Sequence, residues 1–116
     1  MNKLETQMID AIRRGENFES NNTTVVWENG TATVRLHDNK ICVIDRLGNL
    51  YVTWAGWVSR TTTSRLTALL SLIHPHMRAS IAKGKCRIID SEGEEADDLP
   101  SDAWLKVDKQ QQIIYV

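Results

Sequence analysis

The sequence has no apolar run that approaches the roughly 20 residues a helix needs to cross a bilayer. Its first residues, MNKLETQMIDAIRRG, also lack the apolar centre and the small-residue cleavage site of a secretion signal. These absences argue against a membrane protein and against an exported one. The expected location is therefore a cytoplasm, with no membrane partner.

Cysteine and histidine are scarce. The two cysteines, Cys42 and Cys86, have no CxxC spacing, and each lies in an apolar, strand-like run, which favours buried thiols over a redox pair. His74 and His76 are close in sequence, but a zinc signature needs three or four ligands, and His37 is the only other histidine. We therefore expect no metal site and no cofactor.

The local motifs of catalysis are missing as well. The sequence has no GxSxG, no local Cys–His signature, no glycine-rich phosphate loop and no pair of carboxylates framed by apolar residues. The expectation is a protein that is not an enzyme, although a pocket formed only in three dimensions would leave no such motif.

The length and composition of the chain fit one folded domain, residues 1–116. In the N-terminal segment, residues 1–15, apolar side chains recur at helical spacing from Leu4 to Ile12, and Gly15 follows as a stop signal. This pattern predicts a short amphipathic helix at the start of the chain.

Four runs rich in β-branched and aromatic residues occupy residues 23–54: TTVVWE, TATVRLH, KICVID and LYVTW. Asn29-Gly30 between the first two is the strongest hairpin signal, and Asp38-Asn39 and Leu47-Gly48-Asn49 are further turn candidates. Links this short force neighbouring strands to pair antiparallel. The runs therefore predict an antiparallel four-stranded β-meander.

A helical period replaces the strand period over residues 63–77, where Leu66, Leu69, Leu70, Ile73 and Met77 fall on one face. Pro75 marks an end or a kink. Three more strand candidates, KCRIID, AWLKVD and QQIIYV, lie within residues 85–116. The predicted fold class is α+β: the meander packed by one amphipathic helix, with an N-terminal helix and C-terminal strands.

Charge is unevenly distributed along the chain. Residues 1–89 carry twelve lysines and arginines against seven acids, whereas residues 90–116 carry two against eight. Most of the acids fall in SEGEEADDLPSD, residues 91–102, whose Gly, Pro and polar content is typical of a solvated loop. The same acids could dock on a basic partner. The candidate acidic partner-binding residues are Glu92, Glu94, Glu95, Asp97 and Asp98.

The segment WAGWVSRTTTSRLTALL, residues 54–70, places two arginines at the predicted helix start, where cations are unfavourable. Hydroxyls, free N–H groups and guanidinium groups there would attract a phosphate or carboxylate. The alternative is structural: Trp54 fills the core and the arginines find acids elsewhere in the fold. The candidate anion- or partner-binding residues are Trp57, Arg60, Thr62, Thr63 and Arg65, with Arg35 and His37 on the wet strand face.

Two segments, TTVVWENGTATVRLHDNKI and AGWVSRTTTSRLTALL, resemble a group of small uncharacterised proteins from tailed bacteriophages. The resemblance spans about residues 22–70. Asp38 stands where the group has glycine and Thr67 where it often has asparagine, so the geometry of the turn at Asp38 is in question. The resemblance implies the cytoplasm of an infected host as the setting, and it carries no function with it.

Small phage proteins without catalytic motifs commonly act by binding. The leading hypothesis is a non-catalytic accessory protein that binds and modulates a host protein of defence, transcription or replication, through the acidic segment or the Trp57 region. The alternative is a phage nucleic-acid-binding protein that uses Arg60, Arg65 and exposed aromatics. A homodimer formed through an edge strand such as QQIIYV is also open.

Overall fold

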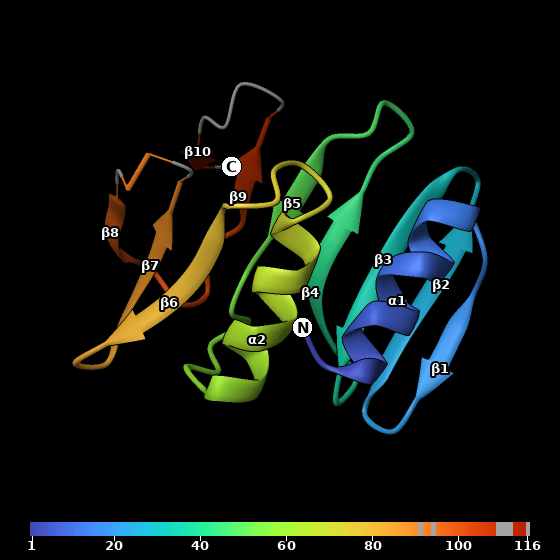
Figure 1. The fold of residues 1–116 in the computed structure, drawn as a ribbon, viewed down its shortest axis with the longest axis horizontal. Coiled ribbons are helices and arrows are strands. Elements are labelled where there is room, and N and C mark those ends of the chain that lie inside the picture. Colours follow the sequence, from blue (N-terminus) through green and yellow to red (C-terminus); the bar gives the residue numbers. More distant parts are fainter. Residues whose placement is uncertain (91, 94, 109–112, 116) are drawn as a thin grey trace.

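The computed structural model describes residues 1–90, 92–93, 95–108 and 113–115. In this part of the chain two helices accompany ten strands (Figure 1). Neither helix, at 12 and 11 residues, is long and apolar enough to span a membrane. The elements follow in the order α1 Lys3–Arg14, β1 Phe18–Ser20, β2 Thr23–Glu28, β3 Thr31–Leu36, β4 Asn39–Ile44, β5 Leu50–Val52, α2 Arg60–Leu70, β6 Arg78–Ala82, β7 Lys85–Ile89, β8 Glu95–Leu99, β9 Leu105–Val107 and β10 Ile113–Tyr115.

The strands form a seven-stranded sheet, ordered β1-β2-β3-β4-β5-β9-β10, and a three-stranded sheet, ordered β6-β7-β8. Every pairing is antiparallel. Both helices pack on one face of the larger sheet, α1 against β1 and β2 and α2 against β4, and α2 also packs against β6 of the smaller sheet (Figure 1). The predicted α+β class, with an antiparallel meander and a helix packed on it, is confirmed, and β1 adds one strand to the predicted four.

Positive φ angles explain two of the hairpins. Asn29 and Gly30 have φ of 53° and 79°, as a type I′ turn requires, so the predicted turn is confirmed. The next turn lies at His37 and Asp38, with φ of 49° and 66°, one residue before the predicted position, because Asn39 already pairs with Leu36. Asp38 therefore adopts the conformation that glycine would favour, and the turn is kept.

The inner face of the large sheet forms the core. One register row crosses five strands through Val25, Val34, Cys42, Val52 and Leu105, and each of these side chains is fully buried. They belong to one apolar cluster that also includes residues of both helices and of the smaller sheet. The alternation of the sequence therefore sets which face of each strand is covered.

Both cysteines are free and buried, as predicted. Burial raises the pKa of the Cys42 thiol far above its ordinary value, and burial together with the negative charge of Asp98 raises the pKa of Cys86. Because the thiolate is the reactive form, both side chains should be inert in the folded protein.

Ellman's reagent should therefore label neither Cys42 nor Cys86 in the native protein and both of them in guanidinium chloride. The native rate should be limited by global unfolding, because neither thiol is accessible without it. Fast labelling of one cysteine under native conditions would contradict the packing described for that residue.

Helix α2 corrects the predicted range of residues 63–77. It begins at Arg60 because Ser59 is its N-cap, with the Ser59 hydroxyl accepting a hydrogen bond from the Thr62 N–H at 3.2 Å. It ends at Leu70, with Ser71 as its C-cap, and the chain then forms turns before Pro75. Met77 is buried, but it lies beyond the helix.

The acidic segment, residues 91–102, was predicted as a loop, and this is wrong for Glu95–Leu99, which forms β8. Within the described residues, strand β8 is an edge of the smaller sheet and pairs with β7, and its last residue, Leu99, is buried. Acidic side chains on an edge strand discourage pairing with another chain. Glu92, Asp97 and Asp98 are exposed, and Glu94 lies outside the described residues.

Candidate functional site

At the start of α2, the hydroxyl groups of Thr62 and Thr63 are engaged in local hydrogen bonds. The Thr62 side chain is 2% exposed and lies 3.0 Å from the Ser59 hydroxyl. The Thr63 hydroxyl donates to the Ser59 carbonyl at 2.7 Å and accepts from the indole N–H of Trp54 at 3.0 Å. The prediction that Thr62 contacts a ligand is therefore wrong, because its hydroxyl is buried in the cap of the helix.

Arg65 is also buried. Its side chain is 7% exposed and forms an ion pair with Glu5 of α1 at 2.8 Å. Its Nε donates to the Thr23 hydroxyl at 3.1 Å, and its second terminal nitrogen lies 3.5 Å from Asn22 Oδ1. The prediction that Arg65 binds an external anion is wrong, since the guanidinium already holds a carboxylate of the same chain.

Glu5 has every carboxylate oxygen engaged. Its Oε1 accepts from the Asn2 N–H at 3.1 Å in a capping box, and its Oε2 accepts from Ser64 and Arg65. Burial by itself raises the pKa of Glu5, but the hydrogen bonds from Ser64, Asn2 and Arg65 outweigh burial and leave the pKa below its usual value. The carboxylate therefore stays ionised and joins α1 to α2, and Arg65 extends this link to Thr23 of β2.

This lowered pKa predicts a loss of stability in acid. Because the pKa of Glu5 is lower in the folded state, its stabilising effect is complete above the ordinary value of 4.5 and is lost as the pH falls through the folded-state pKa. The free energy of unfolding of Glu5→Gln should therefore depend less on pH below about 4.5 than that of the wild type. Urea titrations across this range test the prediction, and parallel pH profiles would contradict it.

The two tryptophans of the segment have opposite environments. Trp54 is fully buried in the core, whereas Trp57 is 64% exposed. Between them lies a hollow of about 430 Å³, here called the tryptophan pocket. Its floor is apolar and its rim polar. The lining residues are Leu36, Ile41, Trp54, Ala55 and Trp57, with His37, Asn39, Ser59 and Thr61 at the rim.

Backbone hydrogen bonds fix the loop that presents Trp57. Ala55 and Gly56 have φ of 55° and 80°, and the Gly56 N–H donates to the Ser101 carbonyl at 2.9 Å. The Trp57 N–H donates to the Trp54 carbonyl at 2.9 Å. The indole of Trp57 is thus exposed on a backbone whose conformation is already determined, which lowers the entropic cost of binding.

A β-bulge supplies the floor of the pocket. The register between β3 and β4 shifts after Val34, so Cys42 pairs with Val34 and Lys40 with Arg35, while Ile41 has no partner. Such an extra residue re-aims its side chain. Ile41 is 1% exposed and lines the tryptophan pocket, so both Ile41 and Cys42 are buried.

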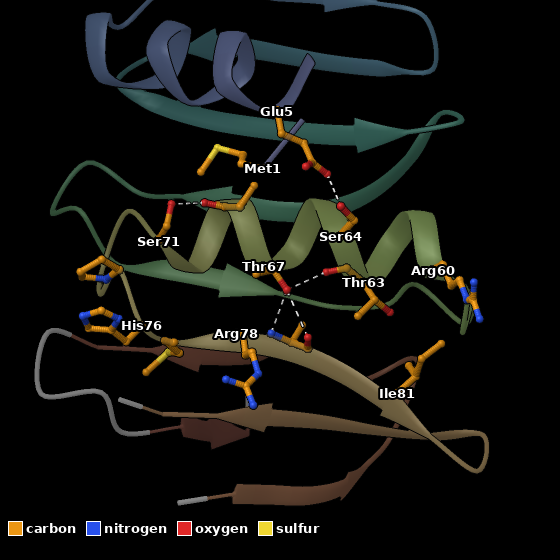
Figure 2. Close-up of a pocket in the computed structure, with 14 residues that line it drawn as sticks. Met1, Glu5, Arg60, Thr63, Ser64, Thr67, Ser71, His76, Arg78 and Ile81 are labelled. Atoms are coloured by element: carbon orange, nitrogen blue, oxygen red, sulfur yellow. Dashed lines mark hydrogen bonds between the residues drawn. The ribbon is translucent and has the colours of Figure 1, made fainter. Parts of the chain in front are cut away.

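The structure brings together only some of the predicted site residues. His37 and Trp57 line the tryptophan pocket. Arg60 and Thr63 line a second hollow, the α2 groove, of about 630 Å³ (Figure 2). Arg35 lines neither hollow, and its strand neighbours in register are Thr24 and Lys40. Glu95, Asp97 and Asp98 lie on β8 of the smaller sheet, and Glu92 lies in the turn before it.

The tryptophan pocket also unites the two segments that carry the phage resemblance. Leu36, His37, Asn39 and Ile41 come from the first segment and Trp57 from the second. Among the residues that the structure describes, no three His, Cys, Asp or Glu side chains converge as a metal site would require. The prominent surface features are instead an aromatic pocket and a groove lined by both hydroxyl groups and apolar side chains.

The fold and these surfaces define a small α+β protein with two hollows beside one helix. The family model described as Kyanoviridae Gp96 protein matches residues 1–106, and the chain belongs to this family of phage proteins. The match confirms the resemblance to bacteriophage proteins that the sequence showed over a shorter range. No curated protein and no solved structure matches the chain.

Proposed function

We propose that this phage protein acts in the cytoplasm of its host by binding a host polypeptide without catalysis, and that the tryptophan pocket is the principal contact. The observation that carries the proposal is the exposed indole of Trp57 beside a hollow with an apolar floor. Exposed tryptophans next to such hollows are typical of the residues that dominate binding energy in protein interfaces.

The size and lining of the pocket suit a short segment of a partner. Its volume of about 430 Å³ would accept one or two bulky apolar side chains over Leu36, Ile41 and Trp54. The polar groups at the rim, such as Asn39 and Thr61, can bond to the partner's backbone. An apolar centre within a polar rim is the usual anatomy of an interface.

The exposed acids of the smaller sheet support the same proposal in a secondary role. Glu92, Asp97 and Asp98 are exposed. Negative charge away from the contact accelerates the encounter with a basic partner more than it tightens the complex. Neutralising them should therefore slow association and leave dissociation nearly unchanged.

The nucleic-acid alternative is weaker than the sequence suggested. It relied on Arg60 and Arg65 as a pair, and Arg65 is bound to Glu5. Trp57 and Arg60 line different hollows, so no single hollow combines the proposed stacking and phosphate contacts. We therefore prefer a polypeptide partner.

Affinity capture from infected cells, with and without nuclease, tests the proposal. The tagged protein should retain one host polypeptide at a constant ratio, and nuclease should leave that ratio unchanged. Loss of the captured polypeptide after nuclease treatment would favour the nucleic-acid alternative, because the polypeptide would then have been held through the nucleic acid. Capture of nothing would contradict the proposal.

A further inference from the structure

The α2 groove runs along α2 between the beginning of α1 and the strand β6 (Figure 2). Helix residues from Arg60 to Ser71 form one wall, so the groove is about 16 Å long at 1.5 Å per residue. Its volume of about 630 Å³ lies within the range of about 300–1,000 Å³ that is typical of small-molecule sites.

Four hydroxyl groups line this wall, on Thr63, Ser64, Thr67 and Ser71 (Figure 2). Each of their protons is already donated within the protein: Thr63 to the Ser59 carbonyl, Ser64 to Glu5, Thr67 to the carbonyls of Thr63 and Ala79, and Ser71 to the carbonyl of Ala68. Thr63 and Thr67 also each accept one hydrogen bond, from the Trp54 indole N–H and from the Ala79 N–H. A hydroxyl oxygen has two acceptor lone pairs, so each of the four can still accept a further hydrogen bond. The wall therefore favours ligand groups that donate hydrogen bonds.

Two arginines border the groove. Arg60 lies at the end where α2 begins, and Arg78 lies on the β6 side (Figure 2). Both side chains are exposed, and neither has a hydrogen bond or an ion pair within the part of the chain that the structure describes. Glu5 also lines the groove, but its negative charge is paired with Arg65.

The guanidinium groups at the rim and the hydroxyl groups of the wall thus bind different kinds of ligand group. Free guanidinium groups bind phosphate oxygens well, because their paired N–H groups match the geometry of the anion. A phosphate cannot lie on the hydroxyl wall, since its oxygens only accept. We propose that the α2 groove binds a phosphate ester with several hydroxyl groups, a sugar phosphate or a nucleotide. The phosphate bonds to Arg60 or Arg78, and the sugar hydroxyls donate to the wall.

This site does not depend on the tryptophan pocket, and purified protein is sufficient to test it. Ribose 5-phosphate, AMP, ribose and inorganic phosphate are titrated separately by calorimetry. Ribose 5-phosphate or AMP should bind about tenfold more tightly than ribose or phosphate alone, because only the esters satisfy both the rim and the wall. Tighter binding of AMP than of ribose 5-phosphate would identify a nucleotide as the ligand.

Variants locate the site. At least one of Arg60→Gln and Arg78→Gln should weaken binding of the ester about tenfold, and Ser71→Ala should weaken its binding by a smaller factor. Arg13→Gln is the matched control, because Arg13 is an exposed arginine of α1 that does not line the groove, and it should have no effect. Three results would overturn the proposal: no saturation at millimolar ester, equal binding of inorganic phosphate, or equal losses in the control and groove variants.

Discussion

Replacing Arg65 by alanine should lower the free energy of unfolding by about 3–5 kcal/mol, measured by urea denaturation at pH 7. The guanidinium is buried against Glu5, Thr23 and Asn22, so its removal leaves an ionised carboxylate without its charged partner. A loss of this size is a large part of the stability of a small domain. The variant should therefore be partly unfolded at physiological temperature.

Arg60→Ala is the matched control, since Arg60 precedes Arg65 by little more than one helical turn and is exposed. It should change the free energy of unfolding by less than about 0.5 kcal/mol. The double variant Glu5→Leu/Arg65→Met should be more stable than either single variant, because no unpaired charge remains buried. Equal effects of Arg60→Ala and Arg65→Ala would contradict the ion pair.

Trp57→Ala should weaken the complex with the captured host polypeptide by about 2 kcal/mol or more, roughly 30-fold in Kd. The substitution removes the largest exposed apolar surface at the tryptophan pocket. Stability should hardly change, because the Trp57 side chain is 64% exposed in the free protein. Titration of the purified partner against both proteins gives the ratio of the two Kd values.

Leu47→Ala is the control for this prediction. Leu47 is 80% exposed, lies between β4 and β5, and does not line the tryptophan pocket. A loss of apolar surface at this position should leave Kd unchanged. Equal weakening by the two substitutions would mean that general apolar exposure, and not the pocket, determines binding.

Local sequence patterns were sufficient to predict the elements whose conformation depends on neighbouring residues. Asn29-Gly30 identified a type I′ hairpin because few residues tolerate two positive φ angles. The alternation of Ala32, Val34 and Leu36 identified the covered face of β3. Strands β1, β6 and β8 were missed. In β1 and β8 the residues, FES and EADDL, are mostly polar and form strands through their neighbours rather than through intrinsic propensity.

The site was harder to predict because it depends on contacts between distant residues. Glu5 and Arg65 are 60 positions apart, and the pattern of one helix cannot show which charged side chain a second helix will cover. The structural alternative placed Trp54 in the core, where it is fully buried, while Trp57, named as a candidate contact residue, is 64% exposed. Arg78 and the hydroxyl wall were missed, although Thr63, Thr67 and Ser71 recur every four residues.

The most direct test of the proposed contact is photo-crosslinking in infected cells from two positions. A benzoylphenylalanine at Thr61, an exposed residue at the rim of the tryptophan pocket, should form an adduct with one host polypeptide. The same group at Leu47 should form none, and Trp57→Ala should abolish the adduct from Thr61. Identical adducts from both positions, or an adduct from Thr61 that survives Trp57→Ala, would contradict the assignment of this pocket as the binding site.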